Sequence, residues 1–195
     1  MSRRKQLWVL AGGNGAGKTT YYQQFLKPRG LAFINADILA KQLDAYHPEK
    51  MSYHAARMAE QLRRELLKTG MSFCFETVFS HPSKVDFIAE AKALGYEVIL
   101  VCIHLENDAL NQARVSQRVA RGGHDVPADK IITRIPRTLA NVRKALPLVD
   151  WFKLYDNSSQ AQPYRSIAVI KHGKLEIEQG ALPHWAQSLL ADYLE

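Results

Sequence analysis

The stretch that decides the fold is Gly12-Gly13-Asn14-Gly15-Ala16-Gly17-Lys18-Thr19-Thr20. It fits the pattern G-x-x-x-x-G-K-[ST], in which small residues let backbone N–H groups turn inward around phosphate oxygens. An apolar run, Leu7-Trp8-Val9-Leu10, leads into it, and a helix-compatible segment, residues 19–26, leads out. The sequence therefore predicts a strand, a phosphate-binding loop and a helix whose positive end faces the bound anion.

Within this loop two side chains have specific expected tasks. Lys18 would reach the β- and γ-phosphates of ATP or GTP, and the Thr19 hydroxyl would hold Mg²⁺. Residues 12–20 are therefore the predicted nucleotide-binding residues. The alternative, a glycine-rich turn that binds nothing, is disfavoured because strand, motif and helix occur in the right order and spacing.

Length and composition favour one globular domain spanning residues 1–195. No apolar run approaches the roughly 20 residues that a membrane span requires, so we expect no membrane partner. The apolar run after the basic start ends at glycines too early for a signal peptide, which predicts a cytoplasmic protein. Cys74 and Cys102 lie in apolar strand-like runs and are expected to be buried reduced thiols.

The formal net charge of +7 predicts a surface that attracts anions. Nucleotides, nucleotide-sugars and nucleic acid all satisfy that description, so charge alone does not choose among them. A basic surface that serves only solubility is an equally acceptable interpretation.

Apolar runs and helical patterns alternate along the chain, which predicts an α/β fold. We expect a three-layer sandwich of the P-loop NTPase type, with a mostly parallel sheet and helices on both faces. Pro136 should kink or split the helix expected over residues 128–145. A hairpin over residues 166–177 and a short helix after Pro183 would form an appendage, residues 164–195 approximately.

Acidic side chains follow two of the expected strands. Asp37 comes just after the strand over residues 31–35, and Glu76 and Thr77 lie at the end of the strand over 71–75. Ligands bind at the carboxyl ends of strands in open α/β sheets, so Asp37 falls near Lys18 if the first two strands are parallel neighbours. A helix N-cap is the alternative role of Asp37. Glu76 could reach a sugar hydroxyl or a metal-bound water.

For two arginines and one histidine the sequence favours structural roles. The helix over residues 48–69 has an expected apolar stripe, which places Arg63 and Arg64 on its solvated face. The stripe consists of Ala55, Ala59, Leu62 and Leu66. His104, near the end of a buried strand, is expected to be a packed histidine rather than a catalyst.

Three arginines share one face of the helix expected to end near Ala120: Arg114, Arg118 and Arg121. A double-glycine break, Gly122-Gly123, and a new helix follow. Such a segment is typical of a mobile lid over phosphates, and a solvated basic face is the alternative.

Taken together, these motifs resemble the zeta toxin family of P-loop kinases, and most closely its small stand-alone members. The resemblance extends over about four fifths of the chain. Beyond the phosphate loop, it rests on the stretches Asn35-Ala36-Asp37, Phe75-Glu76-Thr77-Val78-Phe79-Ser80 and Arg118-Val119-Ala120-Arg121-Gly122-Gly123-His124-Asp125-Val126-Pro127.

The resemblance implies a kinase that uses ATP or GTP with Mg²⁺ and phosphorylates a hydroxyl of a small acceptor. In characterised family members that acceptor is UDP-N-acetylglucosamine, and an antitoxin protein is a possible partner. By this likeness Asp37 is the base, and Glu76 and Thr77 orient the acceptor. Arg118 clamps the γ-phosphate, with Arg121 and Arg134 as the next candidates.

Two other functions stay open from the residues alone. The first is a polynucleotide kinase or another small-molecule kinase on the same scaffold, although nucleic acid is the less favoured acceptor. The second is a nucleotide-dependent switch or binding module without catalysis. Scattered histidines and the absence of G-x-S-x-G and H-E-x-x-H patterns leave little support for a hydrolase or a metalloenzyme.

Overall fold

The computed structural model describes residues 4–123, 125–178 and 180–194. His124 of the glycine-rich break and the first three residues of the basic start therefore lie outside the described residues.

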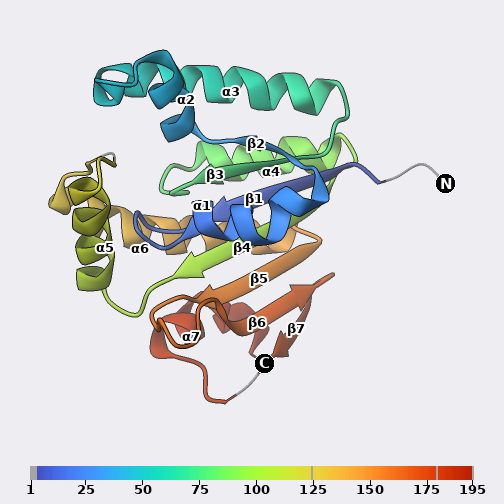
Figure 1. The fold of residues 1–195 in the computed structure, drawn as a ribbon. Coiled ribbons are helices and arrows are strands. Elements are labelled where there is room, and N and C mark those ends of the chain that lie inside the picture. The colour runs from blue at the N-terminus through green and yellow to red at the C-terminus, as the bar shows by residue number, and fades with distance from the viewer. Residues whose placement is uncertain (1–3, 124, 179, 195) are drawn as a thin grey trace.

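The described residues form one seven-stranded sheet in the order β2-β3-β1-β4-β5-β6-β7 (Figure 1). The first five strands are mutually parallel, and the last two are antiparallel to their neighbours. The strands are β1 Gln6–Ala11, β2 Ala32–Ile34, β3 Phe73–Thr77, β4 Glu97–His104, β5 Trp151–Asp156, β6 Arg165–Lys171 and β7 Lys174–Ile177.

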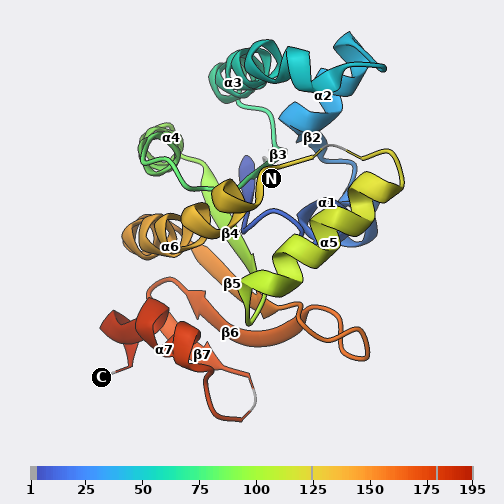
Figure 2. The ribbon, with the colours of Figure 1, turned by 90° about the vertical axis from the view of Figure 1, so that its left-hand side faces the viewer.

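Helices cover both faces of this sheet, which confirms the predicted three-layer sandwich. Figure 2 shows α4 and α6 on one side and α1 and α5 on the other, with the α2–α3 pair beyond the edge strand β2. The helices are α1 Lys18–Tyr21, α2 Ala36–Leu43, α3 Ser52–Lys68, α4 Ser83–Ala93, α5 Asp108–Ala120, α6 Ala128–Ala145 and α7 His184–Leu190.

The central strand β1 shows why both faces need cover. Leu7 and Val9 face the larger hydrophobic core, which is shared with α4 and α6, whereas Trp8 and Leu10 face the core under α1. Side chains alternate between the two faces of a strand, so a strand that is apolar at every position must be buried on both. This buried strand fixes the point from which the glycine-rich loop leaves the sheet.

The strand order differs from the simplest expectation at one place. β3 lies between β1 and β2 and pairs in parallel with both, so the first two strands are not neighbours. All these strands are nevertheless parallel, and their carboxyl ends meet at one edge of the sheet. Asp37, which follows β2, therefore still reaches the edge that holds the Lys18 loop.

The structure excludes two possibilities that the sequence leaves open for helices: a capping role for Asp37 and a split of α6 at Pro136. Asn35, not Asp37, caps α2, because its side-chain oxygen accepts hydrogen bonds from the backbone N–H groups of Asp37 and Ile38. Pro136 lies inside α6 without splitting it, and the helix continues for 18 residues. Buried side chains on both sides of that proline, Ile135 and Thr138 among them, hold the helix against the sheet.

The last part of the chain continues the sheet. β6 pairs with β5, and β7 completes the predicted hairpin. Ala186, Leu189 and Leu190 of α7 belong to the same core cluster as β4 and α6.

Cys74 and Cys102 are free and buried, as predicted. Burial raises the pKa of Cys102 to about 12, so this thiol stays protonated at neutral pH. Among the described residues, no helix is both long enough and apolar enough to cross a membrane.

His104 is packed in the interior, as expected. Its ring is 8% exposed and lies 4.4 Å from the ring of Trp185 in α7. Burial lowers the pKa of His104 to about 4, against the smaller opposing influence of Asp108 and Asp156. The folded protein therefore holds this imidazole in its neutral form.

Replacing His104 should change how stability depends on pH. In the unfolded chain His104 takes up a proton near its ordinary pKa of 6.5, whereas in the folded chain it does so only near 4, so wild-type stability falls as pH drops through that window. In His104→Gln this loss, roughly 3 kcal/mol over the window, should be absent. Urea unfolding at several pH values measures it. Parallel pH profiles for wild type and variant would contradict this account of the buried ring.

Candidate active site

The loop between β1 and α1 depends on glycines at fixed positions. Gly12, Gly15 and Gly17 have φ of 148°, 78° and 101°, a region that side chains rarely enter. Gly12 also packs so closely on the backbone of Ile103 in β4 that a Cβ atom would collide with its carbonyl oxygen. The loop can therefore adopt its turn only because these positions lack side chains.

Three side chains that the sequence analysis did not single out brace this loop from outside. Asn111 donates to the Asn14 carbonyl (2.6 Å), Asn157 donates to the Ala16 carbonyl (2.9 Å), and the Tyr164 hydroxyl donates to the Gly17 carbonyl (2.8 Å). These contacts join the loop to α5 and to the segment after β5. No local motif marks such residues, because they lie about 100 to 150 positions away in the sequence.

Lys18 lies almost entirely inside the loop, with 5% of its surface exposed. Its Nζ donates to the carbonyl oxygens of Gly12 and Gly13, both at 2.9 Å, and lies 3.8 Å from Oε1 of Glu76. Burial lowers the pKa of Lys18, and the carboxylates of Glu76 and Asp37 oppose that shift. The loop thus holds a desolvated cation at its centre.

Glu76 connects three parts of the site. Its Oε2 accepts hydrogen bonds from the Thr19 hydroxyl (2.7 Å) and from the Asn35 side-chain amide (2.8 Å), while Oε1 faces Lys18. The end of β3 therefore meets the start of α1 and the start of α2. This position is closer to the loop than a role in holding the acceptor alone would need.

One cavity of about 940 Å³ collects most of the predicted site residues. Eleven of them line it: Asn14, Gly15, Gly17, Lys18, Thr19, Thr20, Asp37, Glu76, Thr77, Arg118 and Arg134. Four others are not among the lining residues: Gly12, Gly13, Ala16 and Arg121. The first three are buried residues of the loop itself, whereas Arg121 is exposed at the end of α5.

The lining is predominantly cationic. The described residues that line the cavity include seven lysines and arginines but three aspartates and glutamates. Arg114 and Arg118 come from α5 and Arg134 from α6, so two helices on either side of the glycine break deliver cations to one space. Arg114 also donates to the Asn157 carbonyl (2.8 Å), which ties α5 to the segment that braces the loop.

Hydrogen bonds from α6 hold the turn after β3 in place. Phe79 has a φ of 65°, which is unusual for a residue with a side chain. Thr138 donates to the Val78 carbonyl (2.7 Å), Asn141 donates to the Phe79 carbonyl (3.0 Å), and the Thr77 hydroxyl oxygen accepts from the Phe79 N–H (3.0 Å). These bonds fix the direction in which Glu76 and Thr77 face the cavity.

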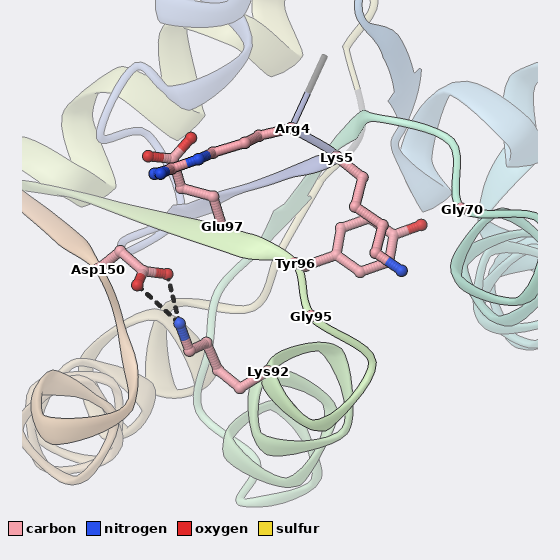
Figure 3. A pocket seen from close by; sticks show the side chains of 8 residues that line it. All are labelled: Arg4, Lys5, Gly70, Lys92, Gly95, Tyr96, Glu97 and Asp150. Carbon is pink, nitrogen blue, oxygen red and sulfur yellow. Dashed lines mark hydrogen bonds and ion pairs between the residues drawn. The ribbon is translucent and has the colours of Figure 1, made fainter. Parts of the chain in front are cut away.

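A second cavity, of about 650 Å³, lies at the opposite edge of the sheet (Figure 3). Its residues precede the amino ends of β1, β3, β4 and β5. The polar groups in it are largely paired: Lys92 donates to both oxygens of Asp150 (2.7 and 2.6 Å), and Asp150 accepts from the Val98 N–H (2.8 Å). No described residue lines both cavities, so this one is separate from the cavity at the Lys18 loop.

The close packing of Gly12 gives a stability prediction. Gly12→Ala should lower the free energy of unfolding by more than about 2 kcal/mol, because the new methyl group overpacks against the backbone of β4. Gly173→Ala is the matched control, since Gly173 also has a positive φ (79°) but open space around it. We expect the control to lose about 1 kcal/mol. Urea denaturation measures both, and equal losses would refute the packing argument.

Comparisons with known proteins agree with this geometry. A family model described as Zeta toxin matches residues 1–167. A protein of Haemophilus influenzae described as uncharacterized is 31% identical over 133 residues, which are 65% of this chain and 94% of that protein.

Solved structures share the fold. A chain of the AvrRxo1-ORF1:AvrRxo1-ORF2 complex with sulphate ions matches with a TM-score of 0.74 and 17% identity, over 91% of this chain and 62% of that one. The same complex with ATP matches with a TM-score of 0.72 and 18% identity, over 91% and 61%. This chain thus spans about three fifths of those chains. A chain of the PezAT chromosomal toxin–antitoxin system of Streptococcus pneumoniae matches with a TM-score of 0.65 and 18% identity, over 98% of this chain and 79% of that one.

At such low identity the structural matches establish the fold alone, a mostly parallel sheet with helices on both faces. The family model, however, extends from the glycine-rich loop through β5 and covers most of the sequence. The protein belongs to the Zeta toxin family, a family of P-loop kinases.

Proposed function

We propose that the chain is a single-domain kinase, residues 1–195, that transfers the γ-phosphate of ATP or GTP to a hydroxyl group of a small-molecule acceptor. The favoured acceptor class is a nucleotide-sugar such as UDP-N-acetylglucosamine. One observation carries the proposal: Lys18, Thr19 and Glu76 form a single bonded cluster in the cavity that Asp37 also lines. The match to a complex that was solved with ATP supports the choice of nucleotide.

At the nucleotide end, residues 12–20 wrap the triphosphate with backbone N–H groups. The Lys18 ammonium, which here contacts the Gly12 and Gly13 carbonyls, exchanges them for phosphate oxygens. The exchange is favourable because the group is already desolvated, so its attraction to an anion is weakly screened. Lys18 thereby stabilises the oxygens on which negative charge gathers as the phosphate transfers.

The donor set near Thr19 suits Mg²⁺. The Thr19 hydroxyl and the Glu76 carboxylate are hard oxygen donors that already lie 2.7 Å apart, and Mg²⁺ is usually bound by a few such protein oxygens together with phosphates and water. When bound, Mg²⁺ neutralises charge on the β- and γ-phosphates. Among the described residues no group of three or more His, Cys, Asp or Glu side chains could hold a metal ion, so the nucleotide and water would supply the remaining ligands.

Asp37 is the proposed base that accepts the proton of the acceptor hydroxyl. It is exposed to the cavity and lies in the first turn of α2, where the capping bonds of Asn35 fix its backbone. Thr77 and Glu76 orient the acceptor from the end of β3. The Thr77 hydroxyl oxygen accepts from Phe79 N–H, which leaves its proton for a hydroxyl or carbonyl of the acceptor.

Arg118 and Arg134 are the proposed clamps on the γ-phosphate, because both line the cavity from opposite sides of the glycine break. An arginine in this role is worth roughly 10³- to 10⁵-fold in rate. Arg121 stays a weaker candidate, since it is exposed and would reach the phosphates only if the segment between α5 and α6 closed over them.

The cellular setting is also a proposal. Two buried free thiols suit a reducing compartment, which favours the cytoplasm. An antitoxin partner is supported only by the toxin–antitoxin context of one matching structure.

Two substitutions separate chemistry from nucleotide binding. Asp37→Asn should reduce phosphoryl transfer by about 10²- to 10⁴-fold while leaving ATP affinity nearly unchanged, because it removes the base without touching the loop. Lys18→Ala should abolish transfer and weaken ATP binding together. Calorimetry with Mg²⁺–ATP and a single-turnover assay measure the two properties. Transfer by Asp37→Asn at the wild-type rate would exclude the carboxylate as base.

The identity of the acceptor is tested by incubating the protein with labelled ATP, Mg²⁺ and a panel of nucleotide-sugars, nucleosides and oligonucleotides. We expect label on a nucleotide-sugar. Label on an oligonucleotide, with binding that weakens steeply as salt rises, would instead support the polynucleotide kinase that the +7 charge also permits. Slow ATP hydrolysis without any labelled acceptor would support a nucleotide-dependent switch.

A further inference from the structure

The wall of the cavity formed by α3 and α4 carries cations that the proposed reaction does not use. Arg63 of α3 and Lys84 of α4 both line the cavity. Figure 2 shows α4 on the face of the sheet opposite α1 and α5, and α3 beyond the edge strand β2. We call Arg63 and Lys84 the α3–α4 cation pair.

Arg63 occupies a position that the sequence pattern assigns to solvent. The apolar stripe predicts that Leu62 is buried and Arg63 exposed, but Arg63 is 7% exposed and Leu62 is 43% exposed. The buried face of α3 consists of Ala55, Ala59, Arg63 and Leu67. The prediction of a solvated Arg63 is therefore wrong, whereas Arg64 is exposed as expected.

The surroundings of Arg63 satisfy it only in part. Its guanidinium lies over the rings of Phe75 (5.0 Å) and Phe87 (5.7 Å). Ring faces attract a cation but do not replace a conventional acceptor. Its Nε is buried and makes no hydrogen bond within the part of the chain that the structure describes. A buried charge with an unsatisfied N–H group is unfavourable unless an anion compensates it.

Lys84 interacts electrostatically with Arg63. Burial and the positive charge of Arg63 both lower the pKa of Lys84. Its Nζ has one weak hydrogen bond, to the Ser83 hydroxyl at 3.4 Å. Two cations that repel each other on one wall of a cavity are typical of a site for an anion.

Glu60 is the nearby carboxylate that opposes this repulsion. It favours the charged forms of both Arg63 and Lys84. However, Glu60 is exposed and is already paired with Arg64, with Nη2 and Oε1 at 3.3 Å. One shared, solvated carboxylate compensates two partly desolvated cations poorly.

We propose that the α3–α4 cation pair binds an anionic group, phosphate or diphosphate, of the acceptor itself. The new step is the assignment of residues: Arg63 and Lys84 recognise the phosphate of the acceptor class already proposed, and they select against neutral sugars and nucleosides. This inference rests on the proposed function for its reaction. It adds that Arg63 and Lys84 determine acceptor specificity from the wall of the cavity that α3 and α4 form.

The test uses the full chain with Mg²⁺ and an ATP analogue that has a β–γ imido bridge, so that the glycine loop is occupied. Inorganic phosphate, UDP-N-acetylglucosamine and N-acetylglucosamine are then titrated by calorimetry. We expect the two anionic probes to bind and the neutral sugar to bind at least about tenfold more weakly, because hydrogen bonds to charged groups are lost. Arg63→Met and Lys84→Met should each weaken the anionic probes by about tenfold or more.

Lys68→Met is the matched control: it removes an exposed cation of the same helix that does not line the cavity and that pairs with Glu65, not with Glu60. It should leave all three affinities at wild-type values, and affinity for the analogue should be unchanged in every variant. Lys84 is only half-buried, so Lys84→Met keeps the test valid if Arg63→Met does not fold. Wild-type affinity of Lys84→Met for both anionic probes, or no preference of the wild type for them, would overturn the proposal.

The transfer assay separates this inference from the proposed function. Phosphorylation of neutral acceptors at rates that Arg63→Met and Lys84→Met do not change would preserve the kinase and refute the anion site. Anion binding that depends on both residues, without phosphoryl transfer to any acceptor, would preserve the site and refute the kinase.

Discussion

A buried ammonium group controls the geometry of this active-site edge. Lys18 is removed from water by the loop that it follows, and charge at such depth requires nearby oxygen atoms. The Gly12 and Gly13 carbonyls provide two, and Glu76 provides a third partner at the end of β3. Because Glu76 is drawn to this cation, its other oxygen is in place to accept from Thr19 and Asn35.

Asn35 connects Glu76 to Asp37, the proposed base. Its amide nitrogen donates to Glu76, while its oxygen accepts from the Asp37 and Ile38 N–H groups. A single side chain therefore connects the lysine–glutamate pair to the first turn of α2. This series of contacts links the glycine-rich loop to α2, although β3 separates β1 from β2 in the sheet.

The sequence predicts the features of the site that depend on local chemistry. Gly12 to Thr20, Asp37 and Glu76 could be identified because strand ends and glycine spacing carry their own signals. Asn111, Asn157 and Tyr164 could not, because each acts through a backbone carbonyl that is distant in sequence. The sequence offers a helix cap as the alternative role of Asp37, but the cap is Asn35, since both residue types are good caps and only the backbone geometry distinguishes them.

The prediction that Arg63 is exposed to solvent fails for a different reason, which is more informative. Local propensity and burial usually agree along a helix, and places where they conflict are often functional. Here α3 buries an arginine and exposes the leucine beside it. In the proposed reaction, a magnesium–triphosphate complex at the loop would neutralise the cations of α1, α5 and α6 first, because these are the residues proposed to contact it. The cations of α3 and α4 would keep their excess positive charge, and this remaining charge favours an acceptor that brings a negative charge of its own.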